Sequence, residues 1–312
     1  MLRRKRKIIH FIRHAESDHN IAPFDTRLRD PYLSQKGRIQ AEALGEQFPH
    51  LQDVDLIVCS PMKRAITTAL LVFKKHLLSS KKQLIALPEL QELSGKPCDT
   101  GSSLAELLTE FREEPLDLNH VPHNWESKDG AWSPTEQRTL ARMTRARAWL
   151  RSRPETNIVV VGHAHCMQLL VRDAPEEYYN DGIEAIRLGL LPEWKNCEWR
   201  SFSAEVHQDH VLWFDELRAS KKAKSRGENV PRLTNGKESR KSSQTSSEMP
   251  DEFDKNRSRS VWSSKSSQLP FPPDTSPDTV TRKARTWPNE AASSPSSPKQ
   301  TRKLLSAIRI RK

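Results

Sequence analysis

The chain has 312 residues, with 51 Lys and Arg against 40 Asp and Glu and a formal net charge of +11. Its apolar fraction of 35% is below the roughly 45–50% of a typical globular chain, which argues against one packed domain that fills every position. No run of 18 uncharged apolar residues occurs, so we expect no transmembrane helix. The basic start precedes too short an apolar run for a signal peptide. Because Cys59, Cys98, Cys166 and Cys197 show no close pairing, we expect reduced thiols in an intracellular protein.

The excess positive charge lies at the C-terminal end. Residues 219–312 hold 21 Lys and Arg and 9 Asp and Glu, a net of +12, whereas residues 1–218 sum to −1. The same segment holds 19 Ser and 9 Pro and few apolar clusters, so it cannot bury enough apolar surface to offset its ordering entropy. We therefore predict a folded domain over 1–218 and a disordered, basic, Ser/Pro-rich tail over 219–312.

Short apolar runs alternate with helical patterns along the first 218 residues. Strands are predicted at Lys7–Ile12, Val54–Ser60, Gln83–Leu87, Asn157–Gly162 and, at an edge of the sheet, Cys197–Val206. Helices are predicted after the N-cap Ser34, after Pro61, at Leu104–Phe111, after Ser133-Pro134 and at His163–Val171. This alternation indicates an α/β domain with a mainly parallel sheet.

Charged and imidazole side chains follow the predicted strands directly. Arg13-His14 follows the first strand, Arg64 comes shortly after the second, Glu89 and Glu92 follow the third, and His163 and His165 follow the fourth. In open α/β sheets, ligands bind outside the carboxyl ends of the strands, so we expect these side chains to converge. Arg clamps phosphate oxygens, neutral His is a nucleophile near pH 7, and a carboxyl group can protonate a leaving alkoxide. The set therefore favours phosphoryl transfer.

The same residues carry a resemblance to the histidine phosphatase superfamily, the phosphoglycerate-mutase-like proteins, including uncharacterised fungal members. Arg13-His14-Ala15 with Asn20 is similar to the Arg-His-Gly signature of the family, with Ala15 in place of Gly. Four further segments resemble family motifs in order: Leu33–Ala41, Ser60–Ala69, Leu90-Gln91-Glu92 and Gly162-His163. The resemblance covers roughly residues 7–206 and implies a three-layer α/β/α sandwich.

The resemblance also implies roles for individual residues. His14 would attack phosphorus and become phosphohistidine, while Arg13, Arg64 and His163 would hold the phosphoryl oxygens. Glu92 would protonate the leaving group and then activate water. Asn20 and His165 are predicted substrate contacts. No metal and no cofactor are expected, because protein cations supply the positive charge.

Three alternatives stay open at this point. Glu89 lies three residues before Glu92 and is a second candidate for the acid. His165 stands where the family commonly has Gly, and it either contacts substrate or faces away. Trp125 and Trp132 either stack on a substrate or pack an insertion against the core.

The resulting hypothesis is a metal-independent phosphomonoesterase that acts on a small phosphorylated molecule. The first rival is a phosphoglycerate-type mutase. The second is a scaffold of low activity that works through its basic tail, whose candidate partners are nucleic acid or an import receptor. We expect a cytoplasmic or nuclear location and no membrane partner, and we assign no oligomeric state.

Overall fold

Seven strands form one sheet in the computed structural model, which describes residues 6–171, 186, 191–206 and 212–233. The strands are β1 (Lys7–Arg13), β2 (Leu56–Cys59), β3 (Leu84–Ala86), β4 (Leu116–Asp117), β5 (Asn157–Gly162), β6 (Trp199–Val206) and β7 (Leu212–Glu216). Their order across the sheet is β4-β3-β2-β5-β1-β6-β7. The strands from β4 to β1 pair in parallel, whereas β6 and β7 are antiparallel. The predicted mainly parallel sheet is confirmed.

The prediction that Cys197–Val206 lies at an edge is wrong. β6 pairs with β1 on one side and with β7 on the other, so β7 forms that edge. Neither β7 nor the two-residue β4 is predicted from the sequence pattern. Both are short, and a single short strand carries little periodic signal.

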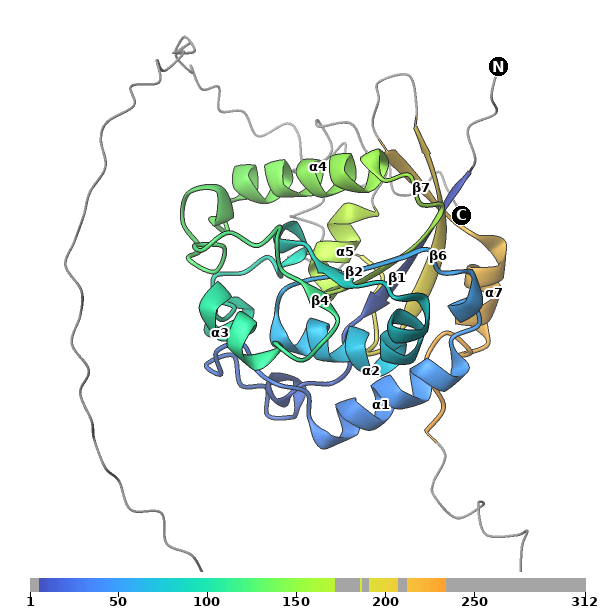
Figure 1. The fold of residues 1–312 in the computed structure, drawn as a ribbon, viewed down its shortest axis with the longest axis horizontal. Helices are drawn as coiled ribbons and strands as arrows, with labels where there is room; N and C mark the ends of the chain where they lie inside the picture. Colours follow the sequence, from blue (N-terminus) through green and yellow to red (C-terminus); the bar gives the residue numbers. More distant parts are fainter. Residues whose placement is uncertain (1–5, 172–185, 187–190, 207–211, 234–312) are drawn as a thin grey trace, which may run out of the picture. The chain divides into compact units, whose positions relative to one another are not determined.

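Six helices of the described residues surround the sheet (Figure 1). They are α1 (Gln35–Gln47), α2 (Lys63–Ser80), α3 (Leu104–Glu110), α4 (Glu136–Ser152), α5 (Ala164–Leu170) and α7 (Arg218–Ser225). Ser34 is the N-cap of α1, as predicted, and its hydroxyl accepts from the Gly37 N–H at 3.0 Å. Each of the five predicted helices is present, with boundaries shifted by a few residues.

The sheet has helices on both faces, and alternate strand residues divide the core between them. Val159 and Val161 of β5 pack into a cluster that contains side chains of α1 and α2. Ile158 and Val160 pack into a second cluster with α4 and α5. Figure 1 shows α1 and α2 on one side of the sheet and α4 on the other. The fold is therefore the expected α/β/α sandwich, because strands that are buried on both faces need two helical layers.

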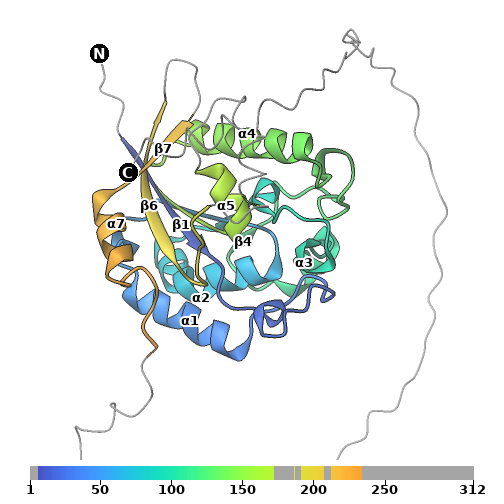
Figure 2. The ribbon, with the colours of Figure 1, turned by 180° about the vertical axis from the view of Figure 1, so that it is seen from behind.

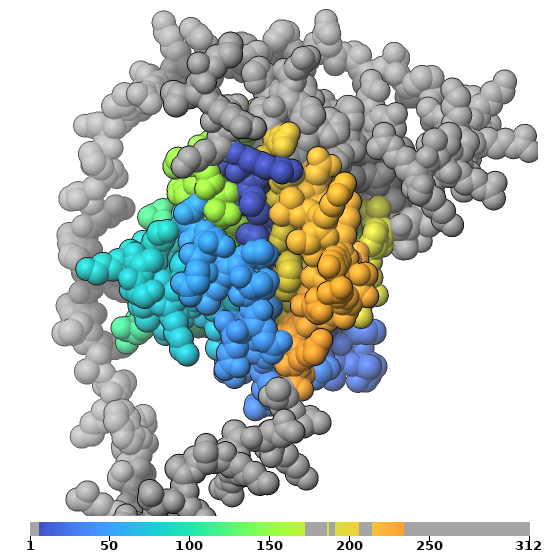
Figure 3. Space-filling view, turned by 90° about the vertical axis from the view of Figure 1, so that its right-hand side faces the viewer, coloured from blue at the N-terminus to red at the C-terminus, as the bar shows by residue number. Residues whose placement is uncertain are grey.

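The folded region continues past residue 218, contrary to the predicted domain boundary. The Ser220 hydroxyl accepts from the Ser201 N–H at 3.0 Å, and the Asn229 carbonyl accepts from the Trp199 N–H at 2.9 Å. Figure 2 shows α7 beside β6. In Figure 3 the orange C-terminal segment lies beside blue α1, where Gln47 exchanges two 2.9 Å bonds with the Arg232 backbone.

Disorder is therefore the wrong expectation for residues 219–233. Composition misplaces the boundary because Lys221 and Lys222 of α7 are exposed while its small residues, Ser220 and Ala223, pack inward. The rest of the predicted tail, 234–312, lies outside the described residues.

All four cysteines are buried, and none forms a disulfide. In the part of the chain that the structure describes, no helix combines the length and hydropathy needed to cross a bilayer.

Candidate active site

The ends of two neighbouring strands, β1 and β5, bring predicted site residues together. Arg13 ends β1 and pairs with Gly162, which ends β5, so His14 and His163 follow at the same level of the sheet. The His14 N–H donates to the Gly162 carbonyl at 2.9 Å, and the two imidazole centroids are 5.2 Å apart. The expected convergence at the carboxyl edge of the sheet is thus present.

A cavity of about 320 Å³ opens at this edge. The predicted residues that line it are Arg13, His14, Asn20, Arg64, Glu92 and His165. His163 does not line the cavity. It is fully buried directly behind His14.

The His14 ring is held in a nucleophilic tautomer. Its Nδ1 lies 2.7 Å from the Ala15 carbonyl, which can only accept, so Nδ1 carries the proton and Nε2 has a free lone pair. Burial, followed by the charges of Arg64 and Arg13, lowers the pKa of His14 well below 6.5. His14 is therefore neutral and able to attack at and below neutral pH.

The two arginines are anchored by the protein and keep buried donors unused. Arg64 donates from Nη1 to the Cys98 carbonyl at 2.6 Å and from Nη2 to Asp99 Oδ1 at 3.1 Å. Arg13 donates from Nη1 to the Trp194 carbonyl. The Nε–H groups of both arginines are buried without a partner among the described residues. Both arginines line the cavity, so their positive charge favours an anion bound there.

His163 supports the site from below. Its Nε2 lies 2.9 Å from the Ser60 hydroxyl, while Nδ1 is buried without a described partner. Burial, then the charge of Arg64, lowers the pKa of His163 well below 6.5. The ring is neutral, and it contributes hydrogen-bonding groups rather than a positive charge.

The choice between Glu92 and Glu89 follows from position. The Glu92 carboxylate lines the cavity and accepts from three backbone N–H groups, those of Leu93 at 2.9 Å, Cys166 at 3.0 Å and His165 at 3.3 Å. Glu89 does not line the cavity and is paired with Arg145 of α4 at 3.3 Å. Of the two candidates, Glu92 and not Glu89 therefore borders the cavity.

The two predicted substrate contacts lie at the wall and mouth of the cavity. Asn20 donates from its amide to His19 Nε2 at 3.0 Å and accepts from the Ser17 N–H at 3.3 Å. His165 is half-exposed, and its Nδ1 is 3.8 Å from Glu92 Oε2. Both residues line the cavity, so His165 does not face away from it.

Trp125 and Trp132 do not line the cavity. Trp125 is fully buried, and a side chain at Gly101 would collide with its indole, because a Cβ at that position would lie 2.1 Å from the ring. Trp132 is buried beneath the Arg145 guanidinium, 5.6 Å from its ring centroid. Packing of the insertion against the core is therefore the alternative that the structure supports.

Pattern analysis missed Asp99 and His19, which also line the cavity. Burial, then the charge of Arg64, lowers the pKa of His19 to about 4. Asp99 lies in the loop after Glu92, where no periodicity or strand end points to it. Its position beside the site becomes evident only from its ion pair with Arg64 in the folded structure.

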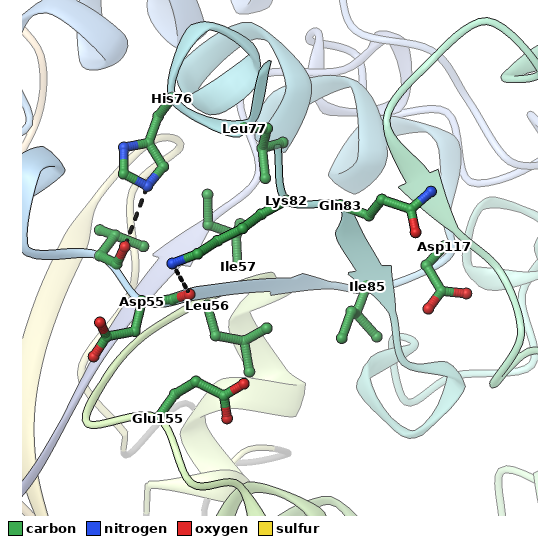
Figure 4. A pocket seen from close by; sticks show the side chains of 11 residues that line it. Asp55, Leu56, Ile57, His76, Leu77, Lys82, Gln83, Ile85, Asp117 and Glu155 are labelled. Atoms are coloured by element: carbon green, nitrogen blue, oxygen red, sulfur yellow. Dashed lines mark hydrogen bonds between the residues drawn. The ribbon is translucent and has the colours of Figure 1, made fainter. Parts of the chain in front are cut away.

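A second cavity of about 280 Å³ lies at the opposite edge of the sheet, at the amino ends of β2, β3 and β5 (Figure 4). Its polar groups make structural bonds. The Lys82 ammonium donates to the Asp55 carbonyl at 2.7 Å, and the Asp55 carboxylate accepts from Thr156 and Asn157. These bonds connect the starts of neighbouring strands. Unlike the first cavity, this one does not place a candidate nucleophile beside two arginines. Nowhere in the described residues do three His, Cys, Asp or Glu side chains gather as metal ligands would.

Comparisons with known proteins show what this chain is similar to. The profile of the histidine phosphatase superfamily (branch 1) matches residues 9–190. A probable phosphatase of Schizosaccharomyces pombe is 25% identical over 68% of this chain and 97% of its own length. A phosphoglycerate mutase-like protein of Arabidopsis thaliana is 24% identical over 62% of this chain and 83% of its own length. Among solved structures, a mycobacterial glucosyl-3-phosphoglycerate phosphatase shares 19% identity over 68% of this chain and 97% of its own, with a TM-score of 0.42.

Proposed function

Because this chain belongs to the histidine phosphatase superfamily, we propose that it is a phosphomonoesterase that works through a phosphohistidine at His14. One observation carries the proposal. A neutral imidazole with a free Nε2 lies in a cavity whose wall also holds Arg13, Arg64 and the Glu92 carboxylate. Phosphoryl transfer needs positioning and positive charge far more than covalent machinery, and this set supplies both.

In the first step, His14 Nε2 attacks phosphorus and the bond between phosphorus and the ester oxygen breaks. Glu92, protonated for this step, gives its proton to the leaving oxygen, which departs as an alcohol. The positive charges of Arg13 and Arg64, which line the cavity, stabilise the charge that develops on the phosphoryl oxygens. The enzyme is then phosphorylated at Nε2, and Glu92 is a carboxylate.

In the second step, water attacks the phosphohistidine. The Glu92 carboxylate takes a proton from the water as the new bond to phosphorus forms and the nitrogen–phosphorus bond breaks. Inorganic phosphate leaves, and His14 returns to its neutral form. His163 and its Ser60 partner hold the base of the site throughout.

The test is phosphate release by the full chain from a broad panel of phosphomonoesters. His14→Ala abolishes release, whereas His120→Ala, at an exposed position, leaves it unchanged. Acid-labile, base-stable phosphate that stays on the wild-type protein during turnover identifies the intermediate. Since arginines supply the charge in this proposal, a chelator leaves the rate unaltered. Equal rates for wild type and His14→Ala contradict the proposal.

The mutase alternative is separated in the same assay. With 3-phosphoglycerate and its bisphosphate supplied together, the proposed hydrolase forms free phosphate. A mutase forms the isomeric phosphoglycerate and little phosphate, because it returns the phosphoryl group to the product.

A further inference from the structure

Asp99 places a carboxylate in the wall of the proposed phosphate site. It is buried, and it accepts from Arg64 Nη2 at 3.1 Å, from the Ser94 hydroxyl at 2.6 Å and from the Cys98 thiol at 3.7 Å. These bonds leave part of its acceptor capacity unused, since a carboxylate offers about four lone-pair positions. The mechanism above assigns it no step, yet it borders the same cavity as His14.

The effect of Asp99 on a bound anion is unfavourable. Arg64 is one of the two arginines available to the phosphoryl group, and Asp99 already neutralises part of its charge. A site built only for highly charged esters would gain from a neutral residue here. Phosphate binding therefore does not explain why a carboxylate lies at this position. The other charged residues that line the cavity suggest a different role for Asp99.

Charges around the cavity are balanced rather than positive. The charged side chains that line it are Arg13, Arg64 and Lys96 against Glu92, Asp99 and Glu193. Lys128 adds a cation behind this wall, where its ammonium donates to the Glu92 carbonyl at 3.2 Å. The two buried arginines serve the phosphoryl group beside His14. Besides the proposed acid Glu92, the charges that remain along the wall are the ammonium of Lys96 and the carboxylates of Asp99 and Glu193, so a second anionic group on the substrate meets more negative than positive charge.

We propose that Asp99 makes the enzyme select phosphomonoesters whose alcohol part carries a hydroxyl or ammonium donor and no second negative charge. The donor binds the free lone pairs of Asp99, and a carboxylate at the same place is repelled. Phosphorylated polyols and amino alcohols fit this description, whereas phosphorylated hydroxy acids do not. The inference rests on the proposed function and specifies its substrate class.

The experiment uses the full chain and two esters that differ at one carbon. Glycerol 3-phosphate carries a hydroxymethyl group where 3-phosphoglycerate carries a carboxylate, and p-nitrophenyl phosphate serves as a reference without a donor. Wild type has a kcat/KM at least tenfold higher for glycerol 3-phosphate than for 3-phosphoglycerate. Asp99→Asn lowers this ratio at least tenfold, chiefly through KM, because the amide keeps an acceptor for Arg64 but loses the charge. Asp99→Glu keeps the preference.

Glu89→Gln is the matched control, since it removes a carboxylate outside the cavity and leaves the ratio unchanged. A wild-type preference for 3-phosphoglycerate overturns the inference without any variant. An equal loss by Asp99→Asn on all three esters also overturns it, because Asp99 then only orients Arg64. If wild type hydrolyses p-nitrophenyl phosphate but shows no preference within the pair, the inference fails while the proposed function stands. If it hydrolyses no ester, both fail.

Discussion

In the proposed mechanism, two features of its surroundings make His14 a nucleophile. The Ala15 carbonyl fixes the proton on Nδ1, and burial beside Arg64 and Arg13 disfavours the imidazolium form. The hydrogen bond to the Ala15 carbonyl leaves the lone pair on Nε2, and the lowered pKa keeps that lone pair unprotonated. A solvated histidine at the same point in the sequence would lose much of its nucleophilicity as the pH fell through about 6.5.

The pH dependence of activity follows from the lowered pKa of His14. Because the pKa lies well below 6.5, the neutral nucleophile persists as the medium is acidified through that value. We expect kcat/KM, corrected for the second ionisation of the substrate phosphate, to show no decline centred near pH 6.5. The measurement is a rate profile from pH 4 to 8, and a loss of activity with a midpoint at 6.5 is the contrary result.

The role of Glu92 as the acid can be tested by comparing esters whose leaving groups differ in their need for a proton. Glu92→Gln loses roughly 10²–10⁴-fold in rate with an alkyl phosphate, whose alkoxide needs a proton. The loss is much smaller with p-nitrophenyl phosphate, whose phenolate leaves unprotonated. Steady-state kinetics on both esters measures the difference, and Glu89→Gln stays close to wild type on both. A Glu92→Gln variant equally impaired on the two esters would show that Glu92 is not the acid.

At the scale of elements, the first turn of α1 packs against the backbone of the segment that follows His14. A Cβ at Gly37 would lie 1.8 Å from the Glu16 carbonyl oxygen, so the first turn of α1 approaches this backbone as only Gly allows. Ser34 secures the same contact, since its N–H donates to the Glu16 carbonyl at 3.1 Å. The helix therefore determines where the segment after the nucleophile can lie.

Gly37→Ala tests this packing, and the sign of its effect is informative. Ala is the better helix former by about 1 kcal/mol, so helix propensity alone predicts stabilisation. The collision with Glu16 predicts the reverse, a net loss of roughly 1–3 kcal/mol in the free energy of unfolding. Urea denaturation measures it, with the exposed Glu42→Ala on the same helix as a nearly neutral control. A more stable Gly37→Ala protein would refute the close approach.

At the scale of the whole molecule, the net charge of +11 is unevenly shared, with −1 in residues 1–218 and +12 in 219–312. The fold does not end where the charge changes. Asn229 reaches back to donate to Glu198 Oε1 at 3.1 Å and to accept from Trp199. The positive helix α7 is thus part of the folded region, and charge composition does not mark its limit.

Two truncations test this limit. A chain ending at Leu233 keeps the bonds of Ser220 and Asn229, so we expect it to melt with the full-length protein. A chain ending at Arg218 loses about three buried hydrogen bonds, each worth about 1 kcal/mol, and melts roughly 6–12 °C lower. Calorimetry on both decides the point. Identical melting of the two truncations would place the domain end at the composition boundary instead.

The chain order of five strands and five helices, and the meeting of Arg13, His14 and Arg64 at one cavity, could be predicted from the sequence. Arg13, His14 and His163 lie at strand ends, and the ends of parallel strands must meet at one edge of a sheet. Local signals suffice there, because each strand is an apolar run and α1 begins at an N-cap serine.

Tertiary structure alone decided what depends on contacts between distant segments. Glu92 and Glu89 are alike in sequence, and only the fold turns one into the cavity and pairs the other with Arg145. Asp99 meets Arg64 across 35 positions, and Ser220 and Asn229 bind β6 although their composition predicts disorder. Chain periodicity reports which face of an element is buried, but which loop lies against which strand end depends on packing that no local pattern records.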